Sequence, residues 1–295
     1  MGRIKHSLLV LLVGGIINIA MIKSGLAKDI IKIGFTNIYT KDTSLWLYMP
    51  FIESVNKNLD KYKLEIVIFD EAEDMIIALS KDNIQIAVAD NGIMYLKDRY
   101  GLTPVLRSRR REYPVLVSAS PIKSIKNNNT IYIFNNRYSI SNYLYPMEYI
   151  ERYGTADKSK YILYKYLYSY ENIFNYIKRQ KKAVGVFSDI ALMNYKTTGL
   201  YKLDLKDKSC CAEVWLVQGK NINESWITGI SETLETQYRR IYGDMIKVIR
   251  SSSGPIKDEL YQKYYSAGYV KADDEWVQET REILNKYMDK LKCAE

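Results

Sequence analysis

Histidine is nearly absent from this sequence of 295 residues, and its single occurrence, His6, lies in an N-terminal segment that we expect to be removed. Cysteine occurs three times and proline six times. A chain without histidine has no Ser-His-Asp or Cys-His catalytic site and no zinc site that uses imidazole. We therefore predict that the chain is not an enzyme and that it has no catalytic residue, no metal site and no cofactor.

Long apolar runs are also missing, apart from one at the N-terminus. Residues 1–6 carry two basic side chains and no acidic one, and residues 8–22 are almost entirely hydrophobic. The small residues Gly25 and Ala27 follow at the spacing of a signal-peptide cleavage site. The run is shorter than the roughly 20 residues of a membrane-spanning helix. We predict a signal peptide, residues 1–27, that is cleaved after Ala27 and directs the chain to the periplasm; an uncleaved anchor is the alternative.

The charge of the chain is moderately positive. The formal net charge is +9, from 43 basic and 34 acidic residues, and cleavage would remove three of the basic ones. Apart from residues 107–111 (RSRRR), the sequence has no basic stripe with interleaved aromatic residues. Nucleic acids bind through such stripes, so we predict no nucleic-acid partner. Residues 109–111 are expected to form a solvated edge or a patch that docks a protein partner.

The three cysteines are Cys210, Cys211 and Cys293, an odd number that leaves at least one thiol unpaired within a monomer. The sequence leaves two alternatives for these cysteines: a disulfide from Cys210 or Cys211 to Cys293, or free thiols. The sequence also leaves two functional alternatives for the vicinal pair. One of its thiols is a nucleophile, although no base partner is visible, or the pair binds a thiophilic solute such as arsenite.

Strands and helices alternate along the first half of the chain. Apolar runs predict strands at residues 30–35, 63–69 and 84–89, with helices at 45–59, 72–79 and from 93. A second unit repeats the pattern, with strands at 130–134, 160–166 and 183–187 and helices at 143–153 and 171–180. Such alternation is typical of parallel sheets covered on both faces. The sequence therefore predicts an α/β class.

Two further strands, at residues 113–119 and 212–218, would connect the two units as a hinge. We predict a bilobal protein, with lobe 1 made of residues 28–117 and 213–295 and lobe 2 of residues 118–212. Helical stretches at 224–242 and 258–292 are expected to pack back onto lobe 1. An exported bilobal α/β chain has the profile of a solute-binding protein that closes on its ligand.

Several short segments resemble the periplasmic substrate-binding proteins of phosphate, phosphite and phosphonate transporters, a module also used as the sensing domain of some histidine kinases. Residues 31–34 (IKIG) fit that family's first strand, and residues 120–125 (SPIKSI) fit the end of its hinge strand. Residues 91–95 (NGIMY) resemble its G-P-x-S-Y loop without the proline. The resemblance covers residues 28–242, and the tail resembles nitrate- and pyrimidine-type binding proteins. It implies the type II periplasmic-binding-protein fold.

The resemblance also implies a site in the cleft between the lobes. Residues 139–142 (SISN) correspond to an S-x-S-G segment whose hydroxyl and backbone N–H groups hold an oxyanion, with asparagine in place of glycine. A helix N-terminus with serine hydroxyls suits an anion, and plain helix capping is the alternative. In residues 168–172 (YSYEN), tyrosine replaces the family's histidine. The candidate ligand-binding residues are Asn37, Tyr39, Asn91, Tyr95, Arg137, Tyr138, Ser139, Ser141, Asn142, Ser169, Tyr170, Ser188 and Asp189.

By this resemblance the chain captures a small oxyanion, phosphonate-like or phosphite-like or another, for the permease of an ABC transporter. The alternative is a ligand-sensing partner of a membrane histidine kinase, which would use the same cleft. The 27 tyrosines leave a further question open. They indicate either an aromatic-lined cleft for an organic or cationic ligand or a bias of composition.

Overall fold

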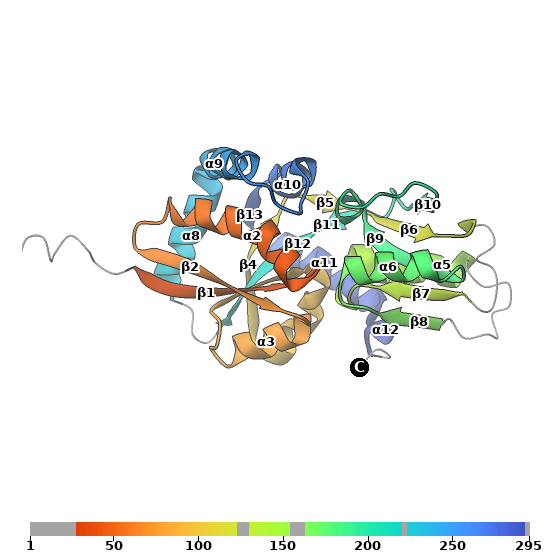
Figure 1. Cartoon of the computed structure of the whole chain (residues 1–295). Coiled ribbons are helices and arrows are strands. Elements are labelled where there is room, and N and C mark those ends of the chain that lie inside the picture. Colours follow the sequence, from red (N-terminus) through yellow and green to blue (C-terminus); the bar gives the residue numbers. More distant parts are fainter. Residues whose placement is uncertain (1–27, 123–129, 154–162, 220–222, 293–295) are drawn as a thin grey trace, which may run out of the picture.

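The structure is a computed structural model that describes residues 28–122, 130–153, 163–219 and 223–292. It consists of two lobes side by side (Figure 1). The expected signal peptide lies outside the described residues, as does Cys293 with the disulfide in which it could take part. In the part of the chain that is described, no helix is both long enough and apolar enough to cross a bilayer.

The first lobe is built on a sheet with the strand order β13-β4-β12-β3-β1-β2. Its strands are β1 (Asp29–Thr36), β2 (Tyr62–Phe69), β3 (Ile86–Asp90), β4 (Leu102–Ser108), β12 (Glu213–Gln218) and β13 (Tyr269–Lys271). β1 is parallel to β2 and β3, whereas β12 returns antiparallel between β3 and β4. The chain therefore leaves this lobe after β4 and comes back into the middle of the same sheet.

The second lobe has a sheet with the order β10-β6-β9-β7-β8. Its strands are β6 (Pro114–Ser118), β7 (Ile131–Phe134), β8 (Leu163–Tyr166), β9 (Ala183–Ser188) and β10 (Tyr201–Asp204). β7 is parallel to β8 and β9, and β6 is antiparallel to β9. The predicted α/β class and the two-unit organisation are confirmed.

The hinge differs from the prediction. Residues 113–119 and 212–218 are largely β6 and β12, which are inner strands of the two sheets. The two lobes are joined instead by the short antiparallel pair β5 (Arg111–Glu112) and β11 (Cys210–Cys211), in which Glu112 lies opposite Cys210. The reason is burial: β6 and β12 are apolar runs buried on both sides, as strands inside a covered sheet are. The chain thus crosses between lobes at β5, before the expected boundary at residue 117.

The helix after β1 begins earlier than predicted. α2 (Lys41–Asn56) is capped by Thr40, whose side chain accepts from the backbone N–H of Thr43. Pro50 lies inside the helix, and the Ser54 hydroxyl donates to the Pro50 carbonyl at 2.8 Å. The buried face of the helix carries several large apolar side chains, so tertiary packing overrides the cost of an internal proline.

The remaining helices surround the two sheets. They are α3 (Ala72–Ser80), η1 (Asn91–Leu96), α4 (Lys97–Tyr100), η3 (Ile140–Leu144), α5 (Tyr145–Tyr153), α6 (Tyr170–Arg179), α7 (Asp189–Leu192), α8 (Glu224–Thr236), α9 (Tyr238–Arg250), α10 (Asp258–Tyr265), α11 (Asp274–Lys286) and α12 (Met288–Lys292). The helix expected over residues 224–242 is thus two helices, separated at Gln237.

The C-terminal helices do more than cover the first lobe. α8, α9 and α10 pack there, but α11 and α12 run behind the hinge toward the second lobe (Figure 1). The hydroxyl of Tyr287 donates to Glu148 of α5 at 2.7 Å, and Lys286 pairs with the same carboxylate at 3.2 Å. The tail therefore ties the two lobes together on one side, whereas the prediction placed it against lobe 1 alone.

Candidate functional site

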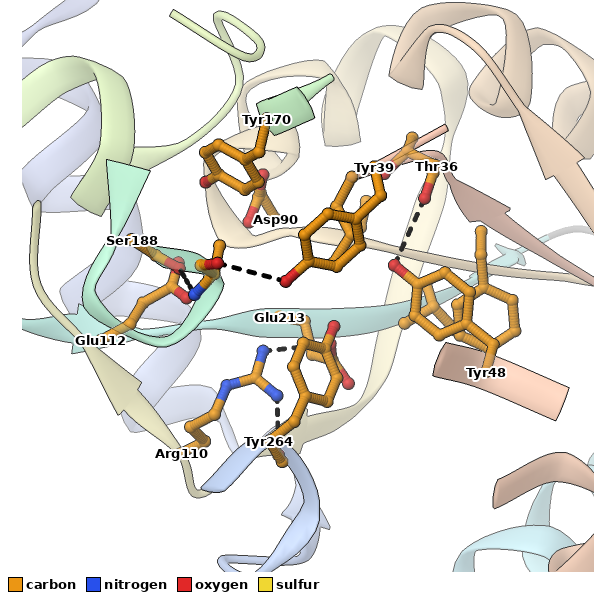
Figure 2. A pocket seen from close by; sticks show the side chains of 15 residues that line it. Thr36, Tyr39, Tyr48, Asp90, Arg110, Glu112, Tyr170, Ser188, Glu213 and Tyr264 are labelled. Carbon is orange, nitrogen blue, oxygen red and sulfur yellow. Dashed lines mark hydrogen bonds and ion pairs between the residues drawn. The ribbon is translucent and has the colours of Figure 1, made fainter. Parts of the chain in front are cut away.

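A pocket lies between the lobes, and side chains from both lobes and from the hinge line it (Figure 2). Its polar lining consists of Thr36, Tyr39, Tyr48, Asp90, Arg110, Glu112, Tyr170, Ser188, Glu213 and Tyr264. The volume is about 30 Å³, which is close to the space of one water molecule. Because the walls come from segments far apart in the sequence, a movement of the lobes changes the size of the pocket.

Arg110 is the cationic group in this pocket. Its side chain is buried, and its guanidinium lies over the ring of Tyr264 with Cζ 3.6 Å from the ring centroid. One terminal nitrogen donates to the Tyr264 carbonyl at 2.7 Å, and the other pairs with Glu213 at 3.4 Å. Among the described residues, no acceptor reaches the Nε–H group. A buried charged donor without an acceptor is costly, so this nitrogen is a natural contact for an anion.

Glu213 serves mainly to neutralise Arg110. Its carboxylate also accepts hydrogen bonds from the hydroxyls of Tyr264, at 2.9 Å, and Tyr269. Both carboxylate oxygens are therefore engaged by the protein itself. Glu213 is a counter-ion that holds Arg110 in place, and it has little capacity left for a ligand.

Two further carboxylates, Asp90 and Glu112, line the pocket. Asp90 ends β3 and accepts from the side-chain amide of Asn136 in the other lobe at 2.8 Å. Burial, with the nearby Glu112 carboxylate, raises the pKa of Asp90 to about 8. Burial also raises the pKa of Glu112. The two groups therefore resist being ionised together at neutral pH.

The serine segment expected to hold an oxyanion holds Glu112 instead. The Ser141 hydroxyl donates to Glu112 Oε1 at 2.9 Å, and the Asn142 side-chain amide donates to the same oxygen at 2.7 Å. Ser139 caps η3 by accepting from the backbone N–H of Asn142 at 3.0 Å. Ser139 is therefore a helix cap, whereas Ser141 binds a carboxylate that belongs to the chain itself.

Two of the predicted tyrosines meet across the cleft. The hydroxyl of Tyr39 donates to the Ala191 carbonyl of the second lobe at 3.4 Å, and the rings of Tyr39 and Tyr170 lie 6.3 Å apart. Tyr170 also stacks on Phe187 with 5.4 Å between ring centroids. Burial raises the pKa of both phenols well above its ordinary value. They are therefore neutral hydrogen-bonding groups and aromatic surface at the same time.

Ser188 and Asp189 follow β9 at the edge of the pocket. Ser188 lines the pocket and caps α7 by accepting from the Ala191 N–H at 3.0 Å. Asp189 is not one of the residues that line the pocket: it accepts from the Tyr113 N–H and pairs with Lys263 of α10 at 3.0 Å. The acidic residue that sequence placed in the site is thus a contact between the lobes.

Arg137 and Tyr138 line a second chamber of about 180 Å³ at the junction of the lobes. Arg137 pairs with Glu73 of α3 at 2.6 Å, and the Tyr138 hydroxyl donates to the same carboxylate at 3.3 Å. The chamber neighbours the pocket because Asn136, which lines the chamber, donates to Asp90. Both residues connect the second lobe to the first.

The other predicted residues lie outside the pocket lining. Asn37 donates to Asp70 at 2.9 Å, and Ser169 caps α6. Tyr95 lines a separate surface groove between η1 and α11. Asn91 donates from its amide to the Cys210 sulfur at 2.7 Å, beside the hinge. The side chains of Asn37, Ser169 and Asn91 thus have partners within the protein.

Cys210 and Cys211 are both free, buried thiols. Burial raises the pKa of Cys210 and raises the pKa of Cys211 to about 11. Thiols with raised pKa values are protonated at neutral pH and are poor nucleophiles. Their partners are Asn91 for Cys210 and the Ser108 carbonyl for Cys211, in line with the opposite orientation of neighbouring side chains in a strand. This geometry does not suit a solute held by both sulfurs.

The lobes touch closely where η1 meets η3. A Cβ atom on Gly92 would lie 2.4 Å from the Tyr138 carbonyl oxygen of the other lobe. We expect Gly92→Ala to hold the lobes apart and to raise the radius of gyration in small-angle X-ray scattering, at a cost to the closed arrangement of about 1–3 kcal/mol. Gly243→Ala in α9, where nothing lies within 4 Å, is the control. Identical scattering of all three proteins would refute this role of Gly92.

The sequence analysis missed the charged centre of the pocket. Residues 109–111 were expected at a solvated edge or docking patch, and this is wrong for Arg110, which is buried in the pocket. Glu112, Glu213 and Asp90 were also not singled out. A signal was present, because each of these three stands at the end of an apolar strand or directly beside one. A charged side chain at the end of a buried apolar strand is expected to be buried too and to be paired with another group of the protein.

The chain matches the family described as "ABC transporter, phosphonate, periplasmic substrate-binding protein" over residues 33–277. None of the curated proteins matches it. Among solved structures, a binding protein component of an ABC phosphonate transporter from Pseudomonas aeruginosa is similar with a TM-score of 0.67 at 13% identity, covering 90% of this chain and 89% of that one.

Two other solved structures share the fold. The periplasmic aliphatic sulphonate binding protein of Escherichia coli has a TM-score of 0.58 at 14% identity and covers 90% of this chain and 88% of its own. The VFT2 domain of Bordetella pertussis BvgS has a TM-score of 0.51 at 11% identity, with 74% and 92% covered. The predicted periplasmic-binding-protein fold is confirmed. The chain belongs to the phosphonate ABC transporter family of periplasmic substrate-binding proteins.

Proposed function

We propose that this protein captures a small oxyanion in the pocket between its lobes and delivers it to the permease of an ABC transporter. The observation that carries the proposal is the Nε–H donor of Arg110, buried in the pocket and without an acceptor among the described residues. An oxygen of a phosphonate, phosphite or sulfonate would complete its hydrogen bonding. Phosphonate and sulphonate are the substrates named for two of the similar structures.

Binding requires the pocket to enlarge. A volume of about 30 Å³ is too small for a tetrahedral oxyanion with an organic substituent, because typical small-molecule sites measure about 300–1,000 Å³. The lobes would part by bending at the β5–β11 pair. The ion pairs Arg137–Glu73 and Lys263–Asp189 would then re-form around the solute at a slightly wider spacing.

The protein in this proposal is a carrier without catalytic activity, exported to the periplasm after cleavage at Ala27. Two buried neutral thiols and a chain that has no histidine after His6 support the absence of catalysis. The alternative, a ligand-sensing partner of a membrane histidine kinase, would use the same pocket and differ in its docking surface. Binding to the permease rather than to a kinase in a pull-down separates the two.

A thermal-shift screen of the purified protein tests the proposal. The panel is phosphite, methylphosphonate, ethylphosphonate, ethanesulfonate and sulfate, with tetramethylammonium as a cation. A ligand at 100 times its dissociation constant adds about 2.7 kcal/mol of stability, which is readily visible. A shift with one of the oxyanions is expected. A panel in which tetramethylammonium alone raises the melting temperature would contradict the proposal.

A further inference from the structure

One helix of the first lobe presents a basic side to solvent. The buried side of α9 is apolar, with isoleucine and methionine at a spacing of four residues. The outer side carries four exposed basic residues, Arg239, Arg240, Lys247 and Arg250. The helix has one acidic residue, Asp244, which pairs with Lys247 at 3.1 Å. A basic amphipathic helix of this kind is typical of surfaces that bind anionic lipid.

The basic groups of α9 have little counter-charge within the protein. In the part of the chain that the structure describes, no acidic group pairs with Arg239, Arg240 or Arg250. The hydrogen bond from Lys247, together with the charges of Arg240 and of Lys57 at the end of α2, lowers the pKa of Asp244. The potential over this side of the lobe is therefore positive, and it is available to an anionic partner.

Two exposed apolar side chains lie beside the basic residues. α9 runs antiparallel to α2: Lys57, at the end of α2, is near Asp244, whereas Trp46 of α2 lies against Gly254, just after α9. Trp46 and Met49, both on α2, are each 43% exposed. Tryptophan beside lysine and arginine suits the boundary between the headgroups and the acyl chains of a bilayer.

Basic side chains outnumber acidic ones on these two helices. The exposed or half-exposed charged residues of α2, its C-cap and α9 are the basic Lys41, Lys57, Arg239, Arg240, Lys247 and Arg250 and the acidic Asp42, Glu53 and Asp244. Figure 1 shows α9 on the outside of the first lobe, away from the second lobe. A flat surface that contacts the outer side of α9 would therefore rest on the first lobe.

We propose that α2 and α9 form a face with which the protein binds an anionic lipid bilayer. Headgroup phosphates accept hydrogen bonds from the arginine and lysine side chains, while Trp46 and Met49 enter the interfacial layer. The proposal goes beyond solute capture, because it places the carrier at the membrane whatever its solute.

The point at which the chain enters the fold agrees with this orientation. The ammonium of Lys28 donates to the Asn56 carbonyl at 3.3 Å, so the chain enters beside the C-terminal end of α2. Before cleavage of the signal peptide, the apolar run of residues 8–22 is joined to this end of the lobe by only five residues. The membrane and the basic face are thus neighbours during export.

Sedimentation with lipid vesicles tests the proposal. Protein cleaved after Ala27 is used, so that the apolar run of residues 8–22 does not insert. The vesicles contain phosphatidylcholine with about one third phosphatidylglycerol, and pure phosphatidylcholine is the comparison. At low salt we expect at least tenfold tighter binding to the anionic vesicles. The preference should disappear at about 0.5 M salt, because salt screens exposed charges.

Charge variants assign the binding to α9. Each basic residue near an anionic surface strengthens binding by about fivefold. Lys247→Gln with Arg250→Gln should therefore weaken binding to the anionic vesicles at least tenfold. Lys181→Gln with Lys182→Gln removes the same charge from an exposed turn of the second lobe and should bind as the wild type does. Melting curves check that both variants are folded.

Tryptophan fluorescence provides a second readout. Of the four tryptophans in the chain, Trp46 is exposed, and the other three are buried. Anionic vesicles should shift the emission to shorter wavelength, and lipids with brominated acyl chains should quench it. Trp46→Phe should abolish both responses while the protein still sediments with the vesicles.

Several results would overturn the lipid-binding face. Equal binding to neutral and anionic vesicles would do so, as would no binding to either at low salt. Equal weakening by the Lys181, Lys182 control pair would do so too, because the attraction would then reflect net charge alone. If the wild type ignores vesicles and the Lys247, Arg250 variant loses the permease in a pull-down, the face binds an acidic protein instead. Solute binding is measured separately, in the thermal-shift screen.

Discussion

An Arg110→Met variant is expected to lose about 3–5 kcal/mol of unfolding free energy, because Glu213 would stay buried without its cation. The Arg110 guanidinium reaches Glu213 and the Tyr264 carbonyl and lies on the Tyr264 ring, so the substitution breaks all three contacts. Urea denaturation measures the loss. Arg281→Met, which removes a partly exposed partner of Asp98, is the control and should cost about 1 kcal/mol or less.

A second substitution distinguishes the structural role of Arg110 from its role in binding. Arg110→Met together with Glu213→Gln removes the whole ion pair, and we expect it to recover much of the lost stability. Binding of ethylphosphonate or ethanesulfonate should remain undetectable in that double variant, because the Nε–H donor is gone. Normal oxyanion binding by the stable double variant would show that Arg110 is only a structural residue.

Removing the donors of Glu112 is expected to have the next largest effect. Ser141→Ala and Asn142→Ala each take away one hydrogen bond to the same carboxylate oxygen, and each should cost about 1–3 kcal/mol of stability. The double variant leaves a buried carboxyl without its side-chain donors, so the pKa of Glu112 should rise further above its ordinary value. Denaturation at several pH values measures both changes.

Ser139→Ala provides the comparison for this pair. Ser139 caps η3 and does not donate to Glu112, so its loss should cost about 1 kcal/mol with no change in how stability depends on pH. A Ser141→Ala, Asn142→Ala protein as stable as the wild type would mean that the two residues do not hold Glu112 in solution. The oxyanion role implied by the sequence resemblance would then be the better account of them.

Much of the architecture could be predicted because buried strands leave a plain apolar pattern. Residues 30–35, 63–69 and 183–187 correspond closely to β1, β2 and β9. β4 and β13 were missed because polar and basic residues interrupt them, so neither displays an apolar run. The hinge was misplaced for a related reason: two-residue strands such as β5 and β11 are too short to produce any periodicity.

The site was only partly predictable, since sequence gives the position of a residue but not its partner. Ser141 and Asn142 were identified as anion donors, and they do bind a carboxylate, yet it is the side chain of Glu112. Arg110 looks like one member of a basic run, and only the fold reveals that it points inward while Arg111 is exposed. Pairings between residues so far apart in the sequence arise from the fold and leave no local pattern in the sequence.

Crystallisation of the protein with ethylphosphonate tests the central claim most directly. The account predicts the phosphonate between the lobes, with an oxygen about 2.7–3.2 Å from Nε of Arg110 and with the ion pairs across the cleft still formed. An ethylphosphonate bound elsewhere, such as the groove between η1 and α11, with Nε of Arg110 still lacking an acceptor, would contradict it.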